Sequence, residues 1–112
     1  MNELLNSGFN TNAKEAEALT EADIKLHQSE IPDWATIDNA PMKIQKVFHF
    51  GDYQEALAFT NSVAALAEEY DHHPQIVLEW GKVKVTWWTH SINGLHHNDL
   101  FMAAKTDLIT AT

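Results

Sequence analysis

The chain has 112 residues, of which 45% are hydrophobic, so it is long enough for one globular domain with a single modest core. It contains no cysteine, which excludes disulfides and thiolate metal sites, and no apolar stretch as long as a membrane span needs. Its formal net charge is -9 and it has no arginine, the usual bidentate ligand of phosphate and guanine, so we expect no direct binding of nucleic acid. The N-terminus lacks the basic and apolar pattern of a secretory signal, which favours a cytoplasmic protein.

The N-terminal part of the chain predicts an arm followed by a short helix. Residues 1–18 are polar and weakly patterned, so we expect a loose arm there and a single domain at 19–112. Thr20-Glu21-Ala22-Asp23 resembles a capping box, with aspartate in place of the usual glutamate, and marks the start of a helix. This helix should reach about Ser29, because Pro32 disfavours helical geometry in the residue before it.

Two strands and a long helix should follow. Apolar and polar residues alternate at 43–50, and a shorter strand is expected at 34–37, with a turn at 38–41 between the two. Asp52, with Glu55 three residues later, is an N-cap pattern, and apolar residues then recur at helical spacing. These apolar positions are Ala56, Phe59, Val63, Leu66 and Tyr70.

The last part of the chain predicts a hairpin and a final helix. Alternating residues give strands at 76–80 and 83–88, joined at Gly81, and the helix should run from 96 or 97 to about 109. Hairpin connections imply an antiparallel sheet, and amphipathic helices must cover one of its faces. We therefore predict an α+β, two-layer fold with a four-stranded antiparallel sheet, in the order α-β-β-α-β-β-α.

The strand tryptophans are candidates for the core or for a binding site. Trp34 and Trp80 are interpreted as core or pocket-wall residues, which the sequence does not separate. Trp87 and Trp88 are adjacent on a strand and therefore point to opposite faces. One of this pair should lie in the core, and the other should line a ligand site or an interface.

The segment 68–74, Glu-Glu-Tyr-Asp-His-His-Pro, is the most informative in the chain. Pro74 requires the long helix to end near Asp71 or His72, so two imidazoles stand at the helix end. Histidine exchanges protons near neutral pH, which leaves acid/base chemistry, a metal site or a merely exposed helix end open. Adjacent imidazoles diverge on a helix or a strand, so His72 and His73 cannot easily share a metal ion, and we expect no metal.

Residues farther along the chain give this segment its specificity. Together they form a pattern of seven residues in a fixed order: Glu68, His72, His73, Pro74, Trp80, His90 and Asp99. Five, nine and eight residues separate the last four of these from one another. The set resembles the signature of the pterin-4a-carbinolamine dehydratases, and the resemblance extends over about 20–107. A match at several points is far more specific than a lone His-His-Pro.

The resemblance implies a reaction. Dehydratases of this family remove water from 4a-hydroxytetrahydrobiopterin and form quinonoid dihydrobiopterin, in tetrahydropterin recycling for aromatic amino acid hydroxylases. The implied mechanism is general acid/base catalysis by histidine, with no metal and no bound cofactor. The implied partners are a pterin substrate, a functional link to an aromatic amino acid hydroxylase, and further copies of the chain in a homodimer or homotetramer.

The resemblance also implies roles for individual residues. His72, His73 and His90 carry over as catalytic histidines, with His72 and His90 as the acid/base pair and His73 gripping the pterin ring. Asp99 either orients a histidine or caps the last helix. The residues implied as substrate-binding or supporting are Glu68, Pro74, Trp80 and Asp99. His96 stands where many members have Ser or Thr, so the cap should weaken or shift to Asn98.

Two other functions stay open from the sequence. Some dehydratase-like proteins are non-catalytic binding modules that serve in dimerisation or assembly, and others could act on a different pterin. The complete set His72, His73 and His90 favours retained catalysis. The chain contains nothing that distinguishes one pterin side chain from another.

Overall fold

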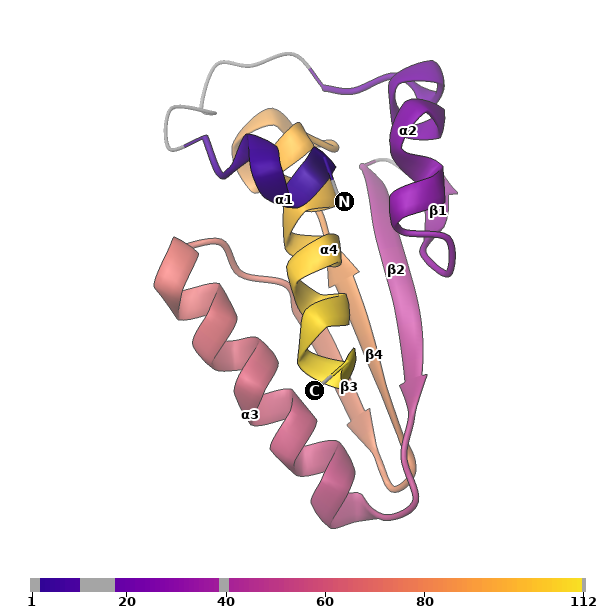
Figure 1. The fold of residues 1–112 in the computed structure, drawn as a ribbon, viewed down its shortest axis with the longest axis vertical. Coiled ribbons are helices and arrows are strands. Elements are labelled where there is room, and N and C mark those ends of the chain that lie inside the picture. Colours follow the sequence, from indigo (N-terminus) through magenta and orange to yellow (C-terminus); the bar gives the residue numbers. More distant parts are fainter. Residues whose placement is uncertain (1–2, 11–17, 39–40, 112) are drawn as a thin grey trace.

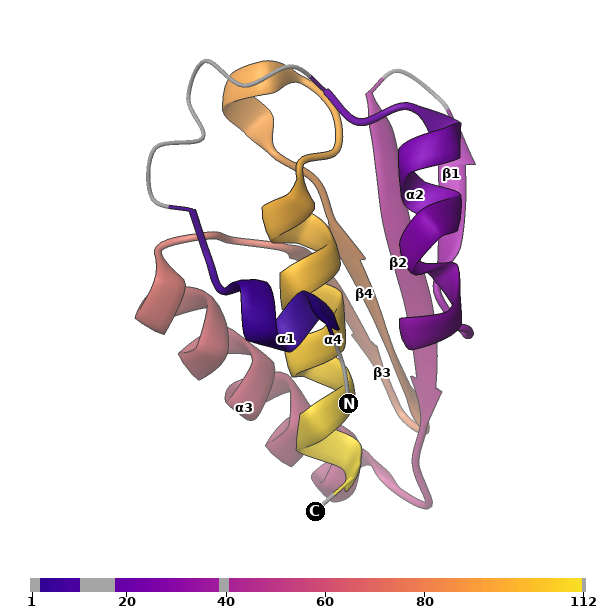
Figure 2. The ribbon, with the colours of Figure 1, turned by 45° about the horizontal axis from the view of Figure 1, so that its top comes forward.

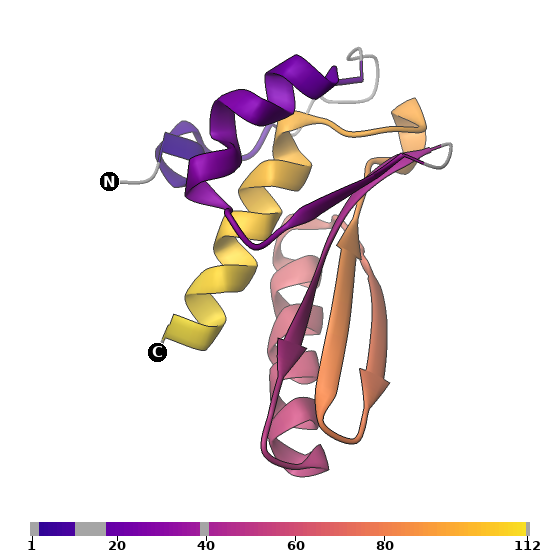
Figure 3. The ribbon, with the colours of Figure 1, turned by 90° about the vertical axis from the view of Figure 1, so that its right-hand side faces the viewer.

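The computed structural model describes residues 3–10, 18–38 and 41–111, and Figures 1 and 3 show a sheet with helices packed on one face. The predicted α+β fold with a four-stranded antiparallel sheet is confirmed, whereas the predicted turn at 38–41 lies largely outside the described residues. The elements in chain order are α1 (Glu3–Ser7), α2 (Glu21–His27), the 3-10 turn η2 (Gln28–Glu30), β1 (Ala35–Asp38), β2 (Met42–His49), α3 (Tyr53–Tyr70), β3 (Gln75–Glu79), β4 (Lys82–Trp87), the 3-10 turn η3 (His90–Ile92) and α4 (His97–Ala111).

The sheet consists of two hairpins joined through their inner strands. Its strand order is β1-β2-β4-β3, and each neighbouring pair is antiparallel. Successive strand residues face opposite sides, so Val83, Val85 and Trp87 of β4 all point to the helix side, where each is completely buried. Lys82 and Lys84, which alternate with the two valines, point to the side without helices. The core therefore lies between one sheet face and the helices.

The long helix α3 forms where its sequence pattern predicts. The side chain of Asp52 accepts a hydrogen bond from the Glu55 N–H, which satisfies a free donor in the first turn. The helix ends at Tyr70, and Asp71 follows in the left-handed conformation with φ of 49°. Its buried residues are Ala56, Phe59, Val63 and Ala67, while Leu66 and Tyr70 pack partly buried against the core.

The N-terminal residues differ from the prediction. The sequence predicts a loose arm over 1–18, but Glu3–Ser7 forms α1, which packs against α4, as Figure 2 shows. Leu4 is completely buried in the core, which explains why this polar segment is held. The capping box that begins α2 is confirmed, with Thr20 and Asp23 each accepting a backbone hydrogen bond from the other. Residues 11–17 of the predicted arm lie outside the described part.

The tryptophans separate into core and surface positions. Trp34 and Trp87 are buried, at 2% and 0% exposure, but Trp80 is 68% exposed at the β3–β4 turn. The core alternative for Trp80 is therefore wrong, because its position in the hairpin turn leaves the side chain in solvent. Its alternative place in a pocket wall stays a prediction. Within the described residues, no helix is both long and apolar enough to cross a membrane.

Candidate functional site

The register of the β3–β4 hairpin decides which predicted site residues come together. His72 and His73 immediately precede β3, whose first residue Gln75 pairs with Thr86 near the end of β4. His90 follows β4 and therefore lies at the same end of the hairpin. Trp80 lies at the opposite end, five residues of extended strand away, which is roughly 17 Å. The structure thus separates Trp80 from the histidines with which the sequence groups it.

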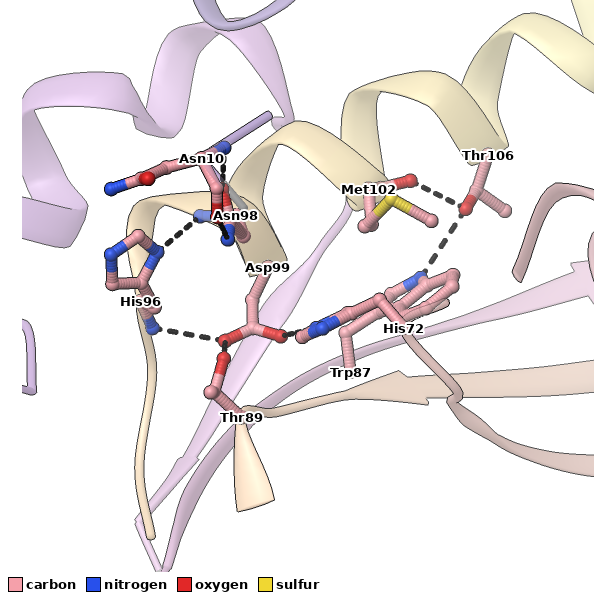
Figure 4. Close-up of polar contacts among 9 residues, drawn as sticks. All are labelled: Asn10, His72, Trp87, Thr89, His96, Asn98, Asp99, Met102 and Thr106. Carbon is pink, nitrogen blue, oxygen red and sulfur yellow. Dashed lines mark hydrogen bonds and ion pairs between the residues drawn. The ribbon is translucent and has the colours of Figure 1, made fainter. Parts of the chain in front are cut away.

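The centre of the site is a contact between His72 and Asp99. The Nε2 atom of His72 lies 2.6 Å from Oδ1 of Asp99, which comes from the first turn of α4 (Figure 4). The Asp99 side chain is fully buried, and that of His72 is 12% exposed. Two segments separated by 27 positions in the chain are therefore joined through one short polar contact.

Asp99 has two further hydrogen-bond partners, and both of them are donors. Its Oδ2 accepts hydrogen bonds from the Thr89 hydroxyl at 2.7 Å and from the His96 backbone N–H at 2.9 Å. An ionised carboxylate accepts but cannot donate, and all these partners can act as donors. His72 must then carry its proton on Nε2, which leaves Nδ1 as the ring nitrogen that can accept a proton. A buried carboxylate with several donors is compensated for its loss of hydration.

The imidazole of His72 is also held by aromatic packing. Its ring stacks on Trp87, with centroids 5.7 Å apart and an angle of 15° between the planes. Trp87 is itself fixed to α4, because its indole N–H donates to the Thr106 hydroxyl, which donates to the Met102 carbonyl (Figure 4). The hydrogen bond and the stack restrict rotation of the His72 ring about both side-chain torsions. Sequence reasoning placed one of the paired tryptophans in the core, and this core tryptophan is the one that contacts His72.

His96 provides the cap of α4. Its Nδ1 accepts a hydrogen bond from the Asn98 N–H at 2.9 Å, and its own N–H donates to Asp99. This is the reciprocal arrangement of a capping box, with an imidazole nitrogen in place of a hydroxyl. The expected shift of the cap to Asn98 is therefore wrong, because unprotonated Nδ1 accepts as a hydroxyl oxygen does.

The protonation of His96 follows from its surroundings. The side chain is buried, with 7% exposure, and burial lowers the pKa of His96 below its ordinary value. The charge of Asp99 opposes this shift and that of His72 adds to it. A lowered pKa keeps His96 neutral near pH 7, which its role as a hydrogen-bond acceptor requires.

His73 and Glu68 form a second, exposed pair. His73 Nε2 lies 2.7 Å from Glu68 Oε1, and the two side chains are 53% and 78% exposed. An exposed pair of this kind contributes only about 0–1 kcal/mol to the free energy of folding. Stabilisation of the fold is therefore a weak explanation for this pair. Pro74, half-buried after His73, directs the chain from α3 into β3.

His90 has different neighbours from the other two histidines. It is exposed at the start of η3, and its ring lies 4.5 Å from that of Trp88. Lys43 Nζ lies 4.4 Å from the Trp88 ring, so a cation and an imidazole both contact this tryptophan. The hydrogen bonds found among the described residues join His72 to Asp99 and His73 to Glu68, but do not include the His90 side chain.

A possible metal-ligand group lies elsewhere. Glu3, His27 and Glu30 each offer a ligand atom within 4.8 Å of the others, the one such group found among the described residues. His27 Nδ1 already lies 3.0 Å from Glu30 Oε2, and Glu30 Oε1 accepts from the Leu4 N–H. These contacts give the group a structural purpose in attaching α1. They do not connect it to His72 or His73.

Two surface hollows also lie apart from the histidines. One of about 290 Å³ is lined by Phe50, Glu55, Ala58, Phe59, Ser62 and Ile109, and one of about 210 Å³ by Glu21, Ile24, Lys25, Gln28, Thr36 and Asp38. Neither lining contains a histidine. We therefore place the candidate site at the imidazole of His72, which Asp99 and Trp87 hold, and not at the larger hollow.

Sequence reasoning missed two site residues, Thr89 and Phe9. It did place His96 at the capping-box spacing, three residues before Asp99, but expected the cap to weaken or to shift. Thr89 is ten positions from Asp99 and carries no local signal. Phe9 belongs to the segment expected to be loose, yet its ring lies 5.6 Å from that of His72.

Comparison with known proteins gives one consistent family. The family model described as pterin 4 alpha carbinolamine dehydratase matches residues 14–109. A curated protein of Nitrosococcus oceani, named provisionally as a pterin-4-alpha-carbinolamine dehydratase, is 51% identical over 94 residues, or 83% of either chain.

Two solved structures resemble the fold. A transcriptional coactivator/pterin dehydratase from Brucella melitensis has a TM-score of 0.76 and 33% identity, over 83% of this chain and 98% of that one. A pterin dehydratase-like protein identified as a RuBisCO assembly factor in the alpha-carboxysome has a TM-score of 0.61 and 28% identity, over 71% of this chain and 92% of that one.

Proposed function

This chain belongs to the pterin 4 alpha carbinolamine dehydratase family, and on that premise we propose that it is an active dehydratase. Its proposed reaction converts 4a-hydroxytetrahydrobiopterin to quinonoid dihydrobiopterin and water. The observation that carries the proposal is the His72–Asp99 contact of 2.6 Å, with Asp99 fully buried and His72 stacked on Trp87. The cap of α4 accounts for Asp99 Oδ2, whereas Oδ1 contacts a partly exposed imidazole, the group that acid/base catalysis would use.

The chemistry needs one proton donor and one proton acceptor. The bond from C4a to the hydroxyl oxygen breaks as that oxygen receives a proton and leaves as water. The N5–H bond breaks as its proton goes to a base, and its electron pair forms the new double bond between C4a and N5. Proton exchange with solvent then restores both groups, and no oxidant or reductant is consumed. Each positioned group typically contributes ~10²–10⁴-fold.

We propose a role for each histidine from the contacts of His72 and His73 and, for His90, from its position in the family's motif. His72, with Nε2–H directed at Asp99, has its Nδ1 available as a base and becomes a donor once that nitrogen is protonated. Asp99 stabilises the imidazolium without itself taking the proton. We assign His90 as the other member of the acid/base pair and His73 as the pterin-binding histidine, with Glu68 orienting His73.

The test is dehydration measured by stopped flow. The substrate, 4a-hydroxytetrahydrobiopterin, is generated in the assay by a phenylalanine hydroxylase. We expect the protein to accelerate dehydration, and His72→Ala to lose at least ~10²-fold in kcat. His73→Ala should mainly raise KM, because a group used only for binding leaves kcat unchanged.

The outcomes separate the candidate functions. No acceleration by the unaltered protein would overturn the dehydratase proposal and favour a binding module, as with the RuBisCO assembly factor among the structural relatives. Full activity in all three alanine variants of His72, His73 and His90 would instead overturn the site assignment. Comparing pterins with different side chains in the same assay would identify the preferred substrate. A functional link to an aromatic amino acid hydroxylase belongs to this proposal.

A further inference from the structure

The segment 3–10, here called the N-terminal strap, is attached at both of its ends. At its start, the Leu4 N–H donates to Glu30 Oε1 at 2.9 Å, and the Leu4 side chain is completely buried. At its end, the Asn10 N–H donates to Asn98 Oδ1 at 2.8 Å, while Asn98 Nδ2 donates to the Asn10 carbonyl at 2.7 Å (Figure 4). Asn98 is 1% exposed, so the amide group that makes both bonds is itself buried, while its partner Asn10 is exposed.

A third attachment lies between these ends. The Ser7 hydroxyl lies 2.9 Å from the Leu4 carbonyl and 2.6 Å from His97 Nε2. A hydroxyl has a single hydrogen, which the carbonyl requires, so His97 donates its Nε2–H to the Ser7 oxygen. The strap is therefore joined to η2 and to two positions in the first turn of α4. That turn also carries Asp99, the partner of His72.

The strap brings one aromatic ring to the candidate site. The ring of Phe9 lies 5.6 Å from the His72 ring, with an angle of 71° between the planes. It also lies 5.2 Å from Tyr70 and 6.1 Å from Phe101, so it bridges the end of α3 and the start of α4. Trp87 stacks on His72 with an angle of 15°, whereas Phe9 meets it edge to face. The imidazole is thus held by two different aromatic contacts and one hydrogen bond.

The strap lies outside the part of the chain that the family model matches. That match covers residues 14–109, whereas Phe9 and Asn10 precede it. A search for the family's signature would therefore pass over Phe9, although its ring contacts His72.

We propose that Phe9 is a positioning residue for His72, held in place by the strap through the Asn10–Asn98 bonds. The proposal rests on the proposed function, because it concerns the histidine assigned there to proton transfer. The Asp99 bond holds one ring nitrogen, and the Trp87 stack restricts the tilt of the ring. The edge-to-face contact of Phe9 adds a further restraint, which opposes displacement of the whole side chain and keeps Nδ1 in one direction. Misplacement by about 1 Å is enough to cost ~10²-fold in rate.

The first experiment compares aromatic variants in the full-length chain. Phe9→Ala should lower kcat by at least ~10-fold and change KM by less than about threefold, because an orientation fault affects the chemical step more than binding. Phe9→Tyr keeps the ring and should restore kcat. The matched control is Phe50→Ala, which truncates a partly buried phenylalanine lining the hollow near Glu55 and should leave kcat unchanged.

The second experiment tests the attachment. Asn98→Ala removes both side-chain hydrogen bonds to Asn10. It keeps the hydrogen bond from the backbone N–H of residue 98 to His96 Nδ1. We expect kcat to fall, as it should for Phe9→Ala. A double variant should fall little further than the Phe9 change alone, since both substitutions release the same ring.

A spectroscopic readout makes the test independent of activity. The Nε2 proton of His72, bonded to Asp99, should give a slowly exchanging NMR signal, assigned by its loss in His72→Gln. Phe9→Ala should broaden or remove this signal, and Phe50→Ala should not. An unchanged signal together with kcat within about twofold of the unaltered protein would overturn the proposal, as would equal losses in Phe9→Ala and Phe50→Ala. If the unaltered protein has no dehydratase activity, the proposed function fails, and the signal alone decides whether the strap positions His72.

Discussion

At the scale of single residues, Asp99 determines more of the site than any histidine does. Its two oxygens accept from the His72 ring, the Thr89 hydroxyl and the His96 backbone N–H. The carboxylate therefore both orients His72 and completes the cap of α4, two roles between which sequence reasoning could not choose. One buried charge serves both, because a carboxylate has acceptor sites for several donors.

Replacing Asp99 by asparagine should separate orientation from packing. The amide nearly conserves shape, but its NH₂ group would face partners that act as donors, so His72 would have to change tautomer or lose its bond. We expect kcat for dehydration to fall by ~10²–10⁴-fold, with a loss of about 1–3 kcal/mol in the free energy of unfolding. Stopped-flow kinetics and urea denaturation measure the two effects.

The control for this change is Asp52→Asn at the N-cap of α3. It is the same chemical substitution at another helix start, and asparagine caps about as well as aspartate. We expect nearly unchanged stability and activity. Equal effects from both substitutions would mean that Asp99 acts only as a helix cap, which would contradict its role in orienting His72.

At the scale of elements, the start of α4 connects the cap, the strap and the candidate site. His96 caps the helix through Nδ1, Asn98 holds Asn10, and Asp99 holds His72, all within one turn. Because the residues that make these contacts are adjacent in one helical turn, a change in the cap should alter the position of His72. The helix start is thus part of the site rather than only a neighbour of it.

The cap should make the free energy of unfolding depend on pH. Burial lowers the pKa of His96 in the folded chain, so the unfolded chain takes up the proton first as pH falls. Stability should therefore be fully present above the ordinary histidine pKa of about 6.5 and decline below it, until the folded-state pKa is passed. Urea denaturation between pH 7.5 and 5 measures this decline.

His96→Ser isolates the contribution of this residue. Serine is a favoured N-cap without a titrating group, so its variant should lose less stability between pH 7.5 and 5. The pKa of His97 is also lowered, first by burial and then by His27 and His96. The effects of burial and of His27 remain in the variant, whereas the effect of His96 is lost. If both proteins showed the same decline, the cap would not be its source.

At the scale of the whole molecule, the helices cover one face of the sheet and leave the other open. That open face carries Lys82, Lys84 and Val47, the last with 39% exposure. Trp80, which the sequence assigned to the core or to a pocket wall, is 68% exposed at the end of the same sheet. Exposed apolar groups on a sheet without a second layer are typical of association surfaces.

We therefore expect a homodimer or homotetramer in solution. Burial of apolar surface between copies would supply the free energy that a small domain cannot gain from its own core. Light scattering coupled to size exclusion at micromolar concentration measures the mass, against 12.7 kDa for one chain. Trp80→Ser provides a variant with less exposed apolar surface. A monomer throughout this concentration range would contradict the expectation.

Much of the fold was predictable because its signals are local. The capping box at Thr20, the N-cap at Asp52 and the end of α3 before Pro74 all depend on residues within four positions of each other. Alternation on the strands likewise predicted the β3–β4 hairpin. The helix α1 escaped prediction, because five residues are too few to form a stable helix alone and need the burial of Leu4 in the core.

The sequence by itself determined the family, the main elements and the identity of the candidate histidines, since spacing and periodicity are properties of the chain. Only the tertiary structure decided that Asp99 pairs with His72, that Phe9 covers its ring, and that Trp80 lies far from both. These facts depend on the strand register and on the packing of α4 and the strap. Contacts between residues 27 or more positions apart leave no local pattern, because it is burial in a common core that brings such residues together.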